Sequence, residues 1–111
     1  MIKVTEAVQT IKKSYPGLEK NNLVSSIADM AQYSIKFFNP GSVKPREIHL
    51  VLQYNRATFH LPYGDDILDT GDMAELEHKV KELAEKGYVI AEQAILFGMT
   101  HKDVIHPAKG G

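Results

Sequence analysis

Apolar and polar residues alternate along Ile48–Leu61, the segment IHLVLQYNRATFHL, on both sides of a central Asn55-Arg56 pair. A period of two in a stretch rich in β-branched and aromatic residues is typical of a strand with one buried face. The segment therefore predicts an antiparallel hairpin that turns at Asn55-Arg56, because asparagine tolerates the left-handed backbone of a tight turn. In this register the facing apolar pairs are Tyr54 with Ala57, Leu52 with Phe59, and Leu50 with Leu61.

The opposite face of this hairpin is mostly polar. It carries His49, Val51, Gln53, Thr58 and His60. Antiparallel sheets commonly bury one face and expose the other, and an isolated hairpin is not stable in water. We therefore expect helices or further strands to cover the apolar face and the polar face to stay open.

Two helices are predicted before the hairpin. Apolar residues at helical spacing over Val4–Tyr15 predict the first, with Thr5 as its N-cap and Pro16-Gly17 as its end. The second begins at residue 21 or 22 and ends at about residue 38, with an apolar arc wide enough for contacts on more than one side.

A helix and a strand are predicted after the hairpin. Asp72 begins the helix, with Glu75 three residues later as in a capping box, and Gly87 ends it. Tyr88–Phe97 follows as a third strand, although Ala91–Ala94 would fit a helix equally well.

The predicted fold class is therefore α+β, in the order α-α-β-β-α-β, with a small, mainly antiparallel sheet and helices packed on one face. Residues 1–111 form a single domain with a short flexible tail at 107–111. A three-stranded sheet leaves two edges open, and open edges favour pairing with a second copy. We therefore expect a homo-oligomer.

Composition excludes several classes of protein. The 111 residues are 43% hydrophobic and 24% charged, which is typical of a folded globular domain. No apolar run reaches the length of a membrane span, so no membrane partner is expected. The chain has no cysteine, which excludes disulfides and fits a cytoplasmic protein. The net charge is −1 and the basic residues are scattered, so a nucleic-acid partner is not expected.

Two groups of residues suggest a metal site. His49 and His60 share the polar hairpin face, offset diagonally, and Asp65 or Asp66 could complete a set of ligands for a divalent metal. The pair lacks the spacing of a zinc motif. The second group is the acidic loop 65–72, whose Asp65, Asp66, Asp69 and Asp72 could bind magnesium or calcium, although their spacing does not match a calcium-binding loop. The alternative is structural, because aspartate favours turns and the start of a helix.

Two motifs near the C-terminus are weaker. The spacing over Glu92–Val104 is faintly similar to a helix-turn-helix, but Pro107 leaves little room for a recognition helix. The terminal Gly110-Gly111 resembles the end of ubiquitin-like carriers, whereas a frayed tail explains it more simply.

No catalytic nucleophile, phosphate-binding loop or dinucleotide motif is present in the sequence, and no cofactor is expected. We therefore predict a small, non-enzymatic interaction or regulatory protein, an adaptor or inhibitor that binds a larger macromolecule, most simply a protein. The predicted contact residues are Arg56, His49, His60 and Gln53, with Tyr33 and Phe37 added if they lie outside the core. The alternative is a protein or enzyme that binds a small molecule or divalent metal through His49, His60 and the acidic loop 65–72.

Overall fold

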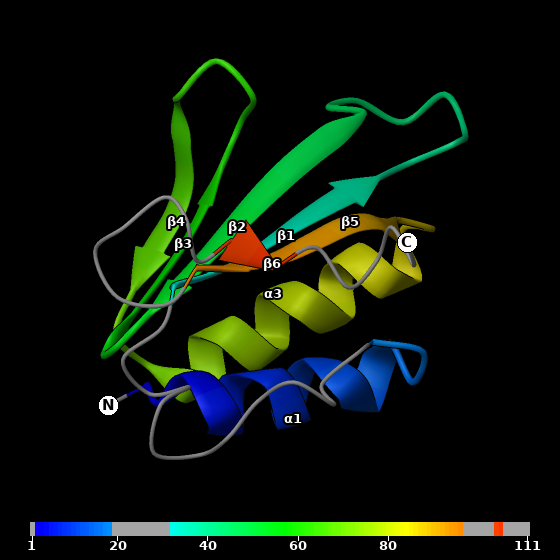
Figure 1. The fold of residues 1–111 in the computed structure, drawn as a ribbon. Helices are drawn as coiled ribbons and strands as arrows, with labels where there is room; N and C mark the ends of the chain where they lie inside the picture. The colour runs from blue at the N-terminus through cyan, green and yellow to red at the C-terminus, as the bar shows by residue number, and fades with distance from the viewer. Residues whose placement is uncertain (1, 19–31, 97–103, 106–111) are drawn as a thin grey trace.

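The computed structural model describes residues 2–18, 32–96 and 104–105. Its elements along the chain are α1 (Val4–Ser14), β1 (Gln32–Phe38), β2 (Glu47–Gln53), β3 (Arg56–His60), β4 (Asp66–Thr70), α3 (Met73–Glu85), β5 (Val89–Leu96) and β6 (Val104–Ile105). The strands form one antiparallel sheet in the order β4-β3-β2-β1-β5-β6 (Figure 1). The protein is therefore α+β with an antiparallel sheet, as the sequence predicts.

Helices α1 and α3 pack side by side on one face of the sheet (Figure 1). Every second residue of the central strands points into the resulting core, which holds Tyr33, Ile35, Phe37, Ile48, Leu50, Leu52, Ala57 and Phe59. The helices contribute Val4, Ala7, Val8, Ile11, Leu76, Val80 and Leu83 at helical spacing. Among the described residues, the helices cover this inner face, and the other face of the sheet carries the alternate, more polar positions.

The predicted hairpin is present as β2 and β3, with its register two residues away from the prediction. Leu50 faces Phe59 and Leu52 faces Ala57. The turn is Tyr54-Asn55, and Asn55 has the positive φ of 69° that asparagine tolerates. A shift of two residues keeps the strand side chains on their faces, so the predicted buried face is confirmed for Leu50, Leu52, Ala57 and Phe59. The prediction was wrong for Tyr54, which lies in the turn and is 55% exposed.

The predicted helix over residues 21–38 is wrong for its second half, because residues 32–38 form β1. Residues 19–31 lie outside the described part. Strand β1 pairs with β2 on one side and β5 on the other. It buries Tyr33, Ile35 and Phe37 completely, or within 1% of completely, on the helix side.

The helix ends agree with the prediction in part. Lys3, not Thr5, is the N-cap position of α1, and its side chain makes no capping hydrogen bond. Asp72 caps α3 as predicted, because its Oδ1 accepts the Ala74 N–H at 2.9 Å. Glu75 accepts from the Thr70 hydroxyl instead of returning to the N-cap backbone.

The acidic segment after the hairpin is a strand rather than a loop. Residues 62–65 make the predicted turn, but Asp66–Thr70 forms β4 and pairs with β3. The predicted third strand is present as β5, which follows Gly87 with its φ of 92°. The tail 107–111 and most of the segment with helix-turn-helix spacing lie outside the described residues.

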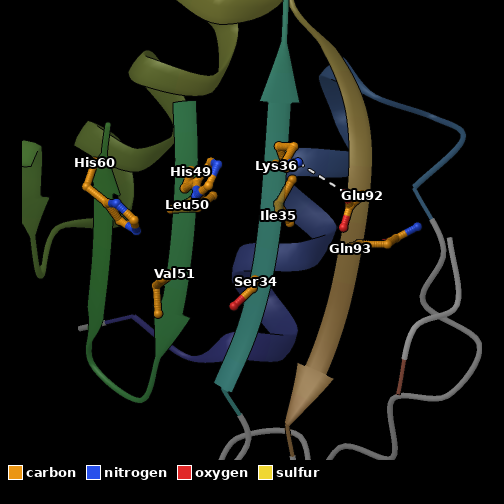
Figure 2. A pocket seen from close by; sticks show the side chains of 9 residues that line it. All are labelled: Ser34, Ile35, Lys36, His49, Leu50, Val51, His60, Glu92 and Gln93. Carbon is orange, nitrogen blue, oxygen red and sulfur yellow. Dashed lines mark hydrogen bonds and ion pairs between the residues drawn. The ribbon is translucent and has the colours of Figure 1, made fainter. Parts of the chain in front are cut away.

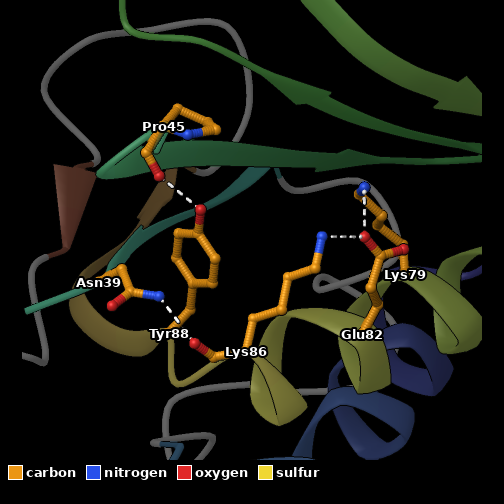
Figure 3. Close-up of polar contacts among 6 residues, drawn as sticks. All are labelled: Asn39, Pro45, Lys79, Glu82, Lys86 and Tyr88. Atoms are coloured by element: carbon orange, nitrogen blue, oxygen red, sulfur yellow. Dashed lines mark hydrogen bonds and ion pairs between the residues drawn. The ribbon is translucent and has the colours of Figure 1, made fainter. Parts of the chain in front are cut away.

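A set of polar contacts joins α3 to the strands near Gly87 (Figure 3). Asn39 Nδ2 donates to the Lys86 carbonyl at 2.8 Å, and the Tyr88 hydroxyl donates to the Pro45 carbonyl. The Tyr15 hydroxyl at the end of α1 donates to the Tyr88 carbonyl at 2.8 Å. These bonds hold the ends of both helices against the β1–β2 connection and the start of β5.

Phe59→Ala is expected to lower the free energy of unfolding by about 3–5 kcal/mol, because it leaves a cavity in the core. Val89→Ala is the control, since Val89 is 48% exposed on β5, and its effect should stay within about 0.5 kcal/mol. Urea unfolding followed by circular dichroism measures both. Equal effects of the two substitutions would contradict the assignment of faces.

Burial raises the pKa of Tyr15 to about 12. An unfolded tyrosine ionises near pH 10, so between about pH 10 and 12 the unfolded chain loses this proton while the folded chain keeps it. The free energy of unfolding should therefore fall as the pH rises through this window. In the Tyr15→Phe variant, the free energy of unfolding measured with urea should fall less steeply over this pH window than in the native chain. Tyr63→Phe, which alters an almost fully exposed tyrosine, should keep the native slope.

Candidate functional site

The outer face of the sheet, the one turned away from α1 and α3, holds a hollow of about 230 Å³ over β1, β2, β3 and β5 (Figure 2). The hollow is lined by side chains of the outer face, which are Ser34, Lys36, His49, Val51, His60 and Glu92. Ile35, Leu50 and Gln93 also line it, although their side chains are buried. The sheet register explains the grouping, because Lys36 faces His49 on one side and Glu92 on the other. We call this set the outer-face hollow.

Charged side chains meet across the strands at one end of the hollow. Lys36 Nζ donates to Glu92 Oε1 at 3.1 Å and lies 3.9 Å from Glu47 Oε1. The hydrogen bond with Glu92 and the attraction of its charge raise the pKa of Lys36. Lys36 therefore stays cationic at neutral pH and links the carboxylates of two strands.

His49 and His60 lie directly opposite each other on β2 and β3, rather than diagonally as predicted. Their ring centroids are 5.3 Å apart in an edge-to-face arrangement. His60 Nδ1 lies 2.8 Å from the Leu61 carbonyl and must donate there, because a carbonyl only accepts. His49 Nε2 is shielded from solvent and lies 3.6 Å from Glu47 Oε2, an ion pair whenever the ring is protonated.

The carboxylates proposed to complete a metal site, Asp65 and Asp66, lie at or next to β4, which flanks β3 on the side away from His49. Asp66 is paired with His60 through the register of β3 and β4, and Asp65 lies in the turn before β4. Within residues 2–18, 32–96 and 104–105, no three histidine, aspartate or glutamate side chains come close enough together to hold a metal ion. The metal hypothesis is thereby reduced to the two imidazoles.

The remaining predicted contact residues lie on the outer face near the hairpin turn. Gln53 Nε2 donates to Gln32 Oε1 at 3.1 Å across β1 and β2. Arg56, at the start of β3, lies 3.4 Å from Asp69 of β4. Both side chains are thus held in cross-strand pairs at the rim of the face.

Tyr33 and Phe37 were predicted as contact residues only if they lay outside the core. Both are fully buried in it, so they are not contact residues. The Tyr33 hydroxyl donates to Gln93 Oε1 at 2.5 Å.

The residues that the prediction missed, Ser34, Lys36 and Glu92, are brought to the site by β1 and β5. Alternation over residues 32–38 was the signal in the sequence that pointed to the first two.

The chain matches no known protein family, no curated protein and no solved structure. Neither α1 nor α3, the helices in the described part of the chain, has the length and apolar character needed to cross a bilayer. The outer-face hollow is therefore interpreted from its own chemistry: cross-strand ion pairs, two opposed imidazoles and one aliphatic side chain, Val51.

Tyr33→Phe should lower the free energy of unfolding by about 1–3 kcal/mol, because it removes the hydrogen bond to buried Gln93. Tyr63→Phe makes the same chemical change at a side chain that is 96% exposed, and should alter stability by less than about 0.5 kcal/mol. Thermal and urea unfolding compare the two. A Tyr33→Phe variant as stable as the control would show that this hydroxyl has no role in the core.

Proposed function

We propose that this protein is a non-enzymatic interaction module that binds a larger macromolecule, another protein, through the outer face of its sheet. The observation that carries the proposal is the one-sided packing. In the described part of the chain both helices lie on one face of the sheet (Figure 1), and the residues of the outer-face hollow lie on the other (Figure 2).

The chemistry of the face favours a polar protein surface as the partner. Lys36, Glu47 and Glu92 place both signs of charge close together, which suits mixed polar contacts rather than a polyanion. Val51 offers an aliphatic contact near the centre, and Arg56, a residue type that is enriched among the strong contacts of interfaces, lies close by at the start of β3. All these side chains project from a paired sheet, so little order has to be gained on binding.

The alternative is a site for a small molecule or divalent metal. It is supported by the two opposed imidazoles with ring centroids 5.3 Å apart. In that case binding would depend on His49 and His60 and respond to a chelator, whereas binding through Arg56 and Val51 would not. The homo-oligomer also remains a prediction, and light scattering during size-exclusion chromatography measures it directly.

Val51→Glu and Arg56→Glu should each weaken binding to a partner purified from the source cells by about tenfold or more, or about 1.4 kcal/mol. The partner is first identified by crosslinking and mass spectrometry, then titrated by calorimetry. Lys81→Glu is the matched charge reversal on the exposed side of α3 and should leave affinity unchanged.

Three results would overturn the proposal: native affinity in both outer-face variants, equal loss in Lys81→Glu, or loss of partner binding on adding a chelator. Melting temperatures of all variants show whether a loss of binding reflects unfolding.

A further inference from the structure

Strand β4 ends the sheet on the side away from β5 and β6. It pairs with β3 on one side, and no strand among the described residues pairs with its other side (Figure 1). An unpaired edge presents a row of backbone N–H and C=O groups that can bond to another extended chain. Such strand addition is a common way to recognise peptides.

The side chains of β4 differ between its two faces. Asp69 lies on the outer face, where its carboxylate accepts from the Thr58 hydroxyl at 3.1 Å. Leu68 lies on the inner face opposite Phe59 and packs against the core. The register shifts between Phe59 and His60, and Ile67 at this irregularity is 38% exposed.

A second hollow, of about 310 Å³, lies beside Leu68 between β4 and α3, distinct from the outer-face hollow. It is lined by Leu68, Ala74, Glu75, His78 and Lys79. A cavity of about 150 Å³ already holds a benzene molecule, so this hollow has room for an aliphatic or aromatic side chain. A strand added beside β4 would direct alternate side chains toward it.

The charge along the edge selects the occupant. Asp65 and Asp66 are exposed, and neither forms an ion pair within the described part of the chain. Antiparallel pairing with a second copy through all of β4 would place Asp66 of one copy opposite Thr70 of the other, next to its Asp69, and like charges close together across strands are unfavourable. Asp66 is paired with His60 of the outer face, so its charge would attract lysine or arginine on the outer face of an added strand, with Asp65 in the adjoining turn adding to the negative charge.

We propose that β4 accepts an extended segment of a partner protein as an additional strand, with basic side chains beside Asp65 and Asp66 and an apolar side chain in the hollow near Leu68. The expected self-association of the chain does not extend to this edge, because the aspartates oppose it. This surface is separate from the outer-face hollow, so the two proposals can fail independently.

The test uses the full chain and end-blocked octapeptides in which lysine alternates with leucine or valine, with binding measured by calorimetry and by amide chemical shifts. We expect saturable binding, with the largest shifts in residues 65–70. A peptide with glutamate in place of lysine should not bind. Asp65→Asn combined with Asp66→Asn should weaken binding about three- to tenfold, whereas Glu85→Gln and Val51→Glu should leave it unchanged.

Backbone methylation separates strand addition from simple charge attraction. Alternate N–H groups of an added strand point toward β4, so methylating the amides of all lysines or of all apolar residues should abolish binding in one case and spare it in the other. Equal binding of both methylated peptides, binding of the glutamate peptide, shifts centred on the outer-face hollow, or no saturation would each overturn the proposal.

Discussion

The hydrogen bonding of β1 on both sides is the constraint on which the rest of the molecule depends. Its pairing with β2 ties the hairpin and β4 to the fold, and its pairing with β5 adds the last strands. Without β1 the sheet would separate into two parts. Its alternation also places Tyr33, Ile35 and Phe37 in the core, while Ser34 and Lys36 lie in the outer-face hollow. The same strand therefore fixes both the core and the candidate site.

Sequence patterns predicted the elements whose signal is local. The hairpin faces, both described helices, the Asp72 cap and β5 were predicted from periodicity and end signals within a few residues of each element. The hairpin register was wrong by two residues, since the backbone places the turn at Tyr54-Asn55. The Asn55 N–H donates to the Ile2 carbonyl at 2.6 Å, a contact between distant parts of the chain that local turn preferences do not include.

The two missed strands have different physical causes. In residues 32–38 the apolar residues also fit a helical stripe continued from Leu23 and Ile27. The segment forms a strand instead because it pairs with β2 on one side and β5 on the other, and the sequence of the segment alone does not contain this information. In β4, three aspartates at or beside a five-residue strand favour a turn by local preference. An edge strand tolerates them because one side of it faces solvent, and charge there protects against unwanted pairing.

About half of the candidate site was predictable from the sequence, because only some of its residues are neighbours along the chain. His49, His60 and Gln53 belong to one hairpin, so alternation alone placed them on a common face. Lys36 and Glu92 are 56 residues apart, and only the order of the strands joins them. Because the outer-face charges already satisfy one another across the strands, a partner there must exchange these pairs for its own rather than meet isolated charges. Specificity on such a face would therefore come from matching the whole pattern of donors and acceptors, with Val51 adding apolar contact, and not from one dominant ion pair.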